Sequence, residues 1–179
     1  MTVSEGMQGG SARNYFDLFR IPTCFDLDVK DLGNRYRTLQ QQFHPDRFSD
    51  GSDVDRRVAA QMSADINAGF QILSDPTSRA GFLLQCEGFD LQALEKQAPS
   101  GEFLMQQMEL REQLQSIPAG QSDAHNQLSA ESRQLFDSQV GIFRDAYAQG
   151  EFDRAGTAWV HLLYLKKLRE EVERRENSQ

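Results

Sequence analysis

Gln40–Asp50 reads Gln-Gln-Gln-Phe-His-Pro-Asp-Arg-Phe-Ser-Asp, and this stretch decides how the first half of the chain folds. Apolar residues recur before it at alternating three- and four-residue steps, as on one face of a helix; they are Val29, Leu32, Tyr36, Leu39 and Phe43. Pro45 ends that helix, because its ring removes an amide donor and disfavours helical geometry at His44. Helical spacing resumes further on, at Val58, Met62, Ile66 and Leu73. His44 and Asp46 are therefore predicted to lie in an exposed loop that joins two helices.

Three further segments match this loop to a known module. They are Ile66-Asn67-Ala68-Gly69-Phe70, Asp75-Pro76 and Arg79-Ala80. Together with Tyr36–Phe48 they resemble the J-domain of chaperone partners. The resemblance implies that the loop and the helix before it bind a DnaK-like ATPase chaperone and stimulate its ATP hydrolysis. It carries that role to His44, Pro45 and Asp46, and the nearby cations available to a negatively charged groove are Arg35, Arg37 and Arg47.

The loop has two other interpretations, an ordinary helix stop and a catalytic site. A His-Pro-Asp tripeptide is often an ordinary helix stop, and arginines on a helix are usually only solvated. The matching segments favour the J-domain. Catalysis by His44 and Asp46 is disfavoured, because no nucleophile, glycine-rich phosphate loop or cluster with metal-ligand spacing accompanies them. We therefore expect a protein that is not an enzyme and has no metal and no cofactor.

Composition narrows the possible functions further. The chain has 179 residues, 39% hydrophobic and 26% charged, which is typical of one or two globular domains. A net charge of −8 argues against a nucleic-acid partner, which would require a basic stripe. Two cysteines far apart, Cys24 and Cys86, predict neither a disulfide framework nor a thiolate metal site. No apolar run is long enough to span a bilayer and no signal-like start is present, so we expect a cytoplasmic protein without a membrane partner.

The predicted fold class is all-α, with two domains. Residues 1–13 are rich in glycine and small polar residues and are predicted to be a disordered tail. Residues 14–88 are predicted to form the J-domain. It contains a helical turn at Asn14–Phe19, a helix capped by Asp28, an antiparallel partner at Asp53–Leu73 and a further helix from Pro76 to about Glu87.

Residues 89–179 are predicted to form a C-terminal three-helix bundle. After a connector with mixed helical character, three amphipathic helices follow, at Ser100–Ile117, Asp123–Gln149 and Phe152–Val172. Short turns join them, and an antiparallel bundle is the simplest way to bury three apolar stripes. His125 and His161 are predicted to be surface or packing residues, because neither has ligands at metal spacing.

The first helix of this bundle has apolar residues on two faces. Phe103, Leu110, Leu114 and Ile117 make one stripe, which is predicted to face the core. On nearly the opposite side Leu104, Met105 and Met108 are interleaved with Glu109, Arg111 and Glu112. This second stripe is either buried by another segment of the chain or exposed. The charges favour exposure, because methionines rimmed by charge make an adaptable binding surface.

The segment Phe103–Leu114, placed after a J-domain at this distance, is similar to the second domain of the HscB family of iron–sulfur co-chaperones. The resemblance implies that this domain holds the cluster-assembly scaffold IscU and that the J-domain presents it to the ATPase chaperone HscA. It assigns scaffold contact to Leu104, Met105, Met108, Glu109, Arg111 and Glu112, with Tyr164 as an aromatic neighbour. Gln113 and Ser116 are neutral where the family often has acidic residues. The rival interpretation is a general J-type co-chaperone that delivers unfolded clients.

Overall fold

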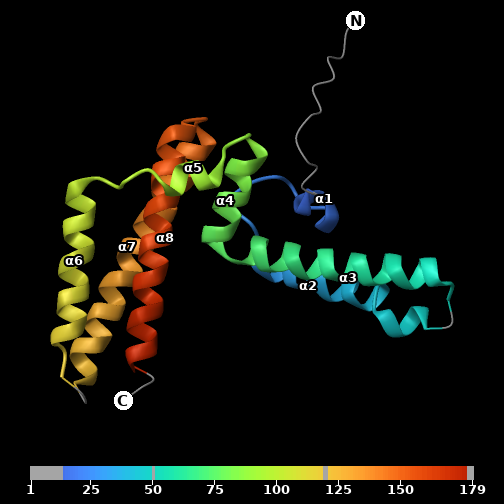
Figure 1. Cartoon of the computed structure of the whole chain (residues 1–179), viewed down its shortest axis with the longest axis horizontal. Helices are drawn as coiled ribbons and strands as arrows, with labels where there is room; N and C mark the ends of the chain where they lie inside the picture. The colour runs from blue at the N-terminus through green and yellow to red at the C-terminus, as the bar shows by residue number, and fades with distance from the viewer. Residues whose placement is uncertain (1–13, 50, 119–120, 177–179) are drawn as a thin grey trace, which may run out of the picture. The chain divides into compact units, whose positions relative to one another are not determined.

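The computed structural model describes residues 14–49, 51–118 and 121–176, and the predicted tail at 1–13 lies outside them. Over these ranges the chain forms eight α-helices and one short 3-10 helix, without a β-strand (Figure 1), so the all-α prediction is confirmed. The described residues divide into two compact units. The first unit comprises 14–23 and 28–73, and the second comprises 24–27 and 74–176. None of the described helices has the length and apolarity needed to cross a bilayer.

The first unit is an antiparallel helical hairpin with a short helix packed on it. Its elements are α1 (Tyr15–Phe19), α2 (Val29–Gln42), the 3-10 helix η1 (Pro45–Phe48) and α3 (Asp53–Ser74). The predicted cap is confirmed, because the Asp28 carboxylate accepts hydrogen bonds from the amides of Lys30 and Asp31. Tyr36 of α2 stacks on Phe70 of α3 with ring centroids 4.3 Å apart. The buried core of this hairpin comprises Phe16, Phe19, Leu32, Ala59, Ile66 and Leu73.

Gly69 allows α3 to approach α1 closely. A Cβ atom at this position would lie 2.7 Å from Cδ1 of Tyr15 and 3.0 Å from Cε2 of Phe19. Gly33 of α2 is different, because among the described residues the nearest atom to its added Cβ is Nη1 of Arg37, at 4.0 Å. The two helical glycines of one hairpin therefore differ in the space around them.

This difference predicts opposite effects of the same substitution. Gly69→Ala should destabilise the protein by about 1–3 kcal/mol, because overpacking outweighs the gain in helix propensity. Gly33→Ala, the matched control, should stabilise it by roughly 0.5–1 kcal/mol. Urea denaturation followed by circular dichroism measures both. Equal stability of the two variants would contradict the close approach of α3 to α1.

The second unit is a three-helix bundle with two further helices packed at one end. The bundle is formed by α6 (Gly101–Ser116), α7 (Ser122–Ala148) and α8 (Phe152–Glu176), and α7 and α8 form an antiparallel hairpin (Figure 1). One core cluster of the bundle comprises Leu110, Leu114, Leu128, Leu168 and Val172. The predicted three-helix bundle is thus confirmed. The remaining helices are α4 (Pro76–Cys86) and α5 (Leu91–Glu95), the latter within the predicted connector.

Helix α4 packs within the second unit. Trp159 of α8 donates a hydrogen bond from Nε1 to the carbonyl of Thr77, at 3.2 Å. Asp75 caps α4 by accepting hydrogen bonds from Ser78, and it also accepts one from Nζ of Lys166 at 3.0 Å. Burial alone would raise the pKa of the Asp75 carboxyl, but the bonds from Ser78 and Lys166 outweigh it and lower the pKa below its ordinary value. The predicted domain ranges, 14–88 for the J-domain and 89–179 for the C-terminal domain, stay a prediction.

The segment Cys24–Leu27, although it precedes α2 in the chain, also belongs to the second unit. Phe25 is buried, with its ring centroid 4.9 Å from that of Phe143 and the guanidinium of Arg79 5.0 Å from its own. Beside it, Nε of Arg144 lies 2.8 Å from a carboxylate oxygen of Asp26. A piece of chain from before α2 therefore completes the packing around α4 and α7.

Candidate functional site

The His-Pro-Asp loop lies at the tip of the α2–α3 hairpin (Figure 1). Helix α2 ends at Gln42, and the extended backbone of His44 is the conformation that a following proline favours. Nδ1 of His44 accepts a hydrogen bond from the amide of Asp46 at 3.3 Å. The side chains of His44 and Asp46 are 55% and 90% exposed. The predicted exposed loop between two helices is confirmed.

Contacts from both flanking helices fix the loop. Arg56 of α3 donates hydrogen bonds from Nη1 to the carbonyls of Ser49 and Gly51, at 3.2 and 3.0 Å. Arg47 donates to the carbonyl of Gln41 at 3.2 Å. These hydrogen bonds fix the backbone of the loop from which the side chains of His44 and Asp46 project. No residue pattern in the sequence indicates this role of Arg56, because its acceptors are the backbone carbonyls of Ser49 and Gly51.

The three arginines predicted for chaperone docking have different surroundings. Arg35 is held within the first unit, with Nε 2.7 Å from a carboxylate oxygen of Asp31 and Nη1 donating to the carbonyls of Phe19 and Arg20. Arg37 and Arg47 are exposed. Arg35 therefore ties the end of α1 to α2, whereas Arg37 and Arg47 leave more of their surface open to a partner. The docking role of all three stays a prediction.

The second candidate surface lies on α6. We define the α6 surface as Leu104, Met105, Met108, Glu109, Arg111 and Glu112. The hydroxyl of Ser100 caps the helix, and Phe103, Leu110 and Leu114 are buried. Met105 and Met108 are 65% and 61% exposed, Leu104 is half-buried, and Glu109 and Glu112 are exposed. The structure thus has the second stripe of α6 exposed at its methionines, as the charges predicted.

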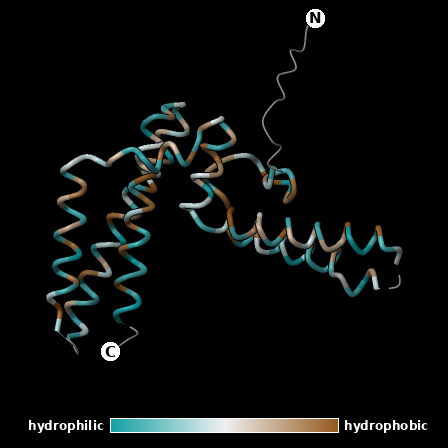
Figure 2. Tube along the Cα trace, viewed as in Figure 1, coloured by the Kyte–Doolittle hydropathy of each residue, from teal (hydrophilic) through white to brown (hydrophobic). Residues whose placement is uncertain are grey.

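Aromatic residues pack beside the α6 surface, against the buried ring of Phe103. Tyr164 of α8 meets Phe103 edge to face, with ring centroids 6.0 Å apart. His161 stacks on the same Phe103 ring at 3.8 Å, and burial lowers the pKa of its imidazole. His125 is almost fully buried. Both histidines are packing residues, as predicted, and Figure 2 shows hydrophobic residues recurring along α6 among hydrophilic ones.

A hollow of about 640 Å³ lies beside Met105. Its walls come from α6, α7 and α8, and its lining includes Phe103, Gln106, Glu109, Gln139 and His161. Within the described ranges, no group of three or more histidine, cysteine, aspartate or glutamate side chains could hold a metal ion. The exposed methionines and this hollow together suit the side chains of a protein partner.

Comparison with known proteins places this arrangement in a family. Residues 100–173 match the family model described as the HSCB C-terminal oligomerisation domain. A co-chaperone protein HscB homolog of Photobacterium profundum is 39% identical over 168 residues, which cover 92% of this chain and 98% of the relative. This chain belongs to the HscB family of co-chaperones.

Solved HscB structures have the same fold. The chaperone HscB from Vibrio cholerae matches with a TM-score of 0.84 at 36% identity, covering 93% of this chain and 99% of that one. The human co-chaperone HscB matches with a TM-score of 0.88, covering 96% and 86%, and at 23% identity it shows the fold alone. The predicted HscB architecture, an N-terminal J-domain followed by a C-terminal helical bundle, is confirmed.

Proposed function

We propose that this HscB-family chain is an adaptor that binds the iron–sulfur cluster scaffold IscU, delivers it to the ATPase chaperone HscA and stimulates ATP hydrolysis by HscA. The observation that carries the proposal is a pair of exposed surfaces with different chemistry in two different units. One is a held polar loop with His44 and Asp46 at its tip, and the other is a helix face with Met105 and Met108 at its centre. Two such surfaces suit two different partners.

The loop is the proposed contact for the ATPase chaperone. Asp46 offers an exposed carboxylate, and His44 offers an imidazole whose Nδ1 is already oriented by the Asp46 amide. Arg37 and Arg47 add positive charge to the surface beside the loop, which suits a negatively charged groove. The chain itself performs no catalysis in this proposal, because HscA is the protein that hydrolyses ATP.

The α6 surface is the proposed contact for the scaffold. Met105 and Met108 are unbranched and polarizable, so they adapt to the shape of an apolar partner surface. Glu109, Arg111 and Glu112 surround them with charge of both signs, which fixes orientation more than it adds affinity. Tyr164 gives the surface an aromatic edge next to Phe103. The resulting complex would bring the scaffold to the chaperone and aid cluster transfer.

Steady-state ATPase assays with purified HscA test the proposal. This chain should stimulate hydrolysis, and folded IscU added with it should raise the rate further. A reduced, denatured protein in place of IscU distinguishes the general co-chaperone, which would respond to the denatured protein and not to the folded scaffold. Stimulation that is indifferent to IscU, together with binding of many denatured proteins, would exclude the adaptor.

A further inference from the structure

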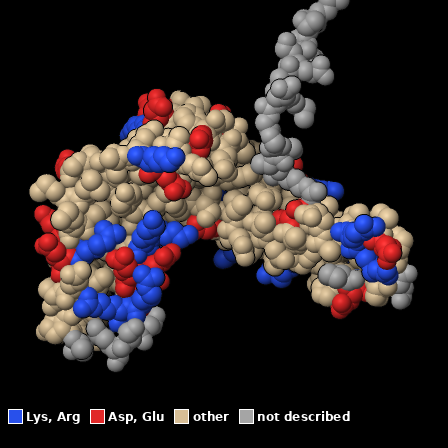
Figure 3. Space-filling view, in the orientation of Figure 1, with Lys and Arg blue, Asp and Glu red and all other residues tan. Residues whose placement is uncertain are grey.

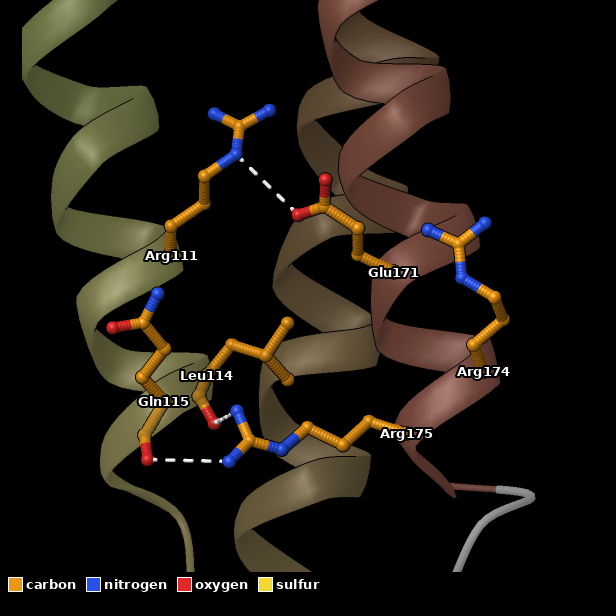
Figure 4. Close-up of a pocket in the computed structure, with 6 residues that line it drawn as sticks. All are labelled: Arg111, Leu114, Gln115, Glu171, Arg174 and Arg175. Carbon is orange, nitrogen blue, oxygen red and sulfur yellow. Dashed lines mark hydrogen bonds and ion pairs between the residues drawn. The ribbon is translucent and has the colours of Figure 1, made fainter.

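A cleft between the last turns of α6 and α8 is lined by three arginines (Figure 4). Its volume is about 330 Å³. The lining residues are Arg111, Leu114 and Gln115 from α6 and Glu171, Arg174 and Arg175 from α8. Three guanidinium groups and one carboxylate give the cleft a formal charge of +2, whereas the whole chain has a charge of −8. Figure 3 shows Lys and Arg gathered with acidic residues over this end of the bundle.

Two of the guanidinium groups, those of Arg111 and Arg175, are held by contacts with other residues of the cleft. Nε of Arg111 faces a carboxylate oxygen of Glu171 at 3.4 Å, across the cleft (Figure 4). Arg175 donates from Nη1 to the carbonyl of Leu114 at 2.8 Å and from Nη2 to that of Gln115 at 3.4 Å. A guanidinium group has five N–H donors in a planar fork, so these contacts orient Arg111 and Arg175 and still leave donors for a ligand.

The cleft continues the α6 surface along the same side of the helix. Leu104, Met108, Arg111 and Gln115 follow one another at i, i+4, i+7 and i+11, which places them on one ridge. On α8, Tyr164, Glu171 and Arg175 have the corresponding spacing of i, i+7 and i+11. The ridge on α6 is about 16 Å long at 1.5 Å per residue. A single docked protein can therefore cover both its apolar end and its cationic end.

We propose that this cleft binds carboxylates presented by an acidic segment of the protein that docks on the α6 surface. The proposal rests on the proposed function, in which that protein is the iron–sulfur scaffold. Arginine forks match carboxylates in a bidentate geometry. In the last turn of α6, Gln113, Gln115 and Ser116 are neutral, and Glu112, one turn before Ser116, does not line the cleft. Besides Glu171, the last turns of α8 contain three acidic residues that do not line the cleft: Glu170, Glu173 and Glu176.

Arg174 is the residue to substitute, because Arg175 also binds the end of α6. Arg174→Glu should weaken scaffold binding by about tenfold at low salt, Arg174→Gln by about threefold, and Arg174→Lys less than either, since lysine keeps the charge without the fork. The differences should shrink at high salt, because surface charges are screened. The matched control is Arg154→Gln, which makes the same charge change about 30 Å away along α8.

Calorimetric titrations with folded scaffold at low and high salt, together with urea denaturation of each variant, test the proposed carboxylate site. If the wild-type protein binds the scaffold and the Arg174 variants bind it as tightly as the Arg154→Gln control does, the proposed carboxylate site is overturned. The proposed function then still stands. Arg174 variants that lose stability and keep their affinity would show that this arginine only compensates the negative end of α8. Wild type that fails to bind the scaffold would overturn the proposed function and the cleft with it.

Discussion

Replacing His44 by glutamine should abolish the stimulation of HscA while the fold and scaffold binding stay intact. The His44 side chain is 55% exposed and makes its polar contacts with Asp46, so little packing is lost and stability should change by less than about 0.5 kcal/mol. The proposed contact with the chaperone loses the imidazole ring that the loop exposes. Steady-state ATPase rates of HscA, with and without the variant, measure the effect.

The same His44→Gln protein supplies its own control. Its denaturation midpoint and its calorimetric affinity for the scaffold should equal those of wild type, because the α6 surface belongs to the other unit. If the folded variant stimulates ATP hydrolysis by HscA as well as wild type does, the loop is not the chaperone contact. A variant that is unfolded would instead show that His44 has a structural role that its exposure does not suggest.

Replacing Met105 and Met108 together by alanine should weaken scaffold binding by well over tenfold. Anchors at the centre of an interface commonly contribute about 2 kcal/mol or more each. Both side chains are more than half exposed, at 65% and 61%, so stability should fall by much less than the 2–5 kcal/mol typical of a buried methionine. Stimulation of HscA by the variant alone should survive, and the extra stimulation with added scaffold should fall.

The chain offers a matched control for this double variant. Val54 and Val58 of α3 are 61% and 56% exposed and one helical turn apart, so their replacement by alanine removes apolar surface from a comparable position in the first unit. Calorimetric titration should show normal scaffold affinity for the valine variant. If the methionine variant also binds normally, the interface lies elsewhere, and if it melts early, the methionines are core residues.

Much of the fold could be predicted because apolar periodicity and helix-end signals agree, most clearly at α2 and α6. Asp28 and Ser100 cap the helices that were predicted to start beside them, and Pro45 follows the end of α2. Helix α5 is different, since five residues make too few turns for a period to be recognised. The end of α8 was predicted at Val172, whereas the helix continues to Glu176, because a charged stretch without apolar residues gives no periodic signal.

The candidate sites were predicted less completely, since some contacts depend on tertiary geometry. Arg35, a predicted docking cation, also donates from Nη1 to carbonyls 15 and 16 residues earlier in the chain, which no pattern in the sequence indicates. Arg20, at the end of α1, has a left-handed backbone conformation with φ of 54°, which no sequence pattern predicts. Arg174 and Arg175 fell beyond the predicted end of α8, so the cationic cleft was missed. The exposure of Met105 and Met108 was predicted because helical spacing places them away from the core stripe and the charges beside them favour exposure.

The segment Cys24–Leu27 sets an order of events during synthesis of the protein. Asp26 and its partner Arg144 are 118 residues apart, and Phe25 packs against Phe143 beside them. At about 5–20 residues per second, the ribosome needs roughly 6–24 s to make the chain between them. The helical hairpin of the first unit emerges within that interval and can begin to fold. Phe25 lies in the short stretch between α1 and α2, so its packing against Phe143 closes a loop that contains helices α2 to α6.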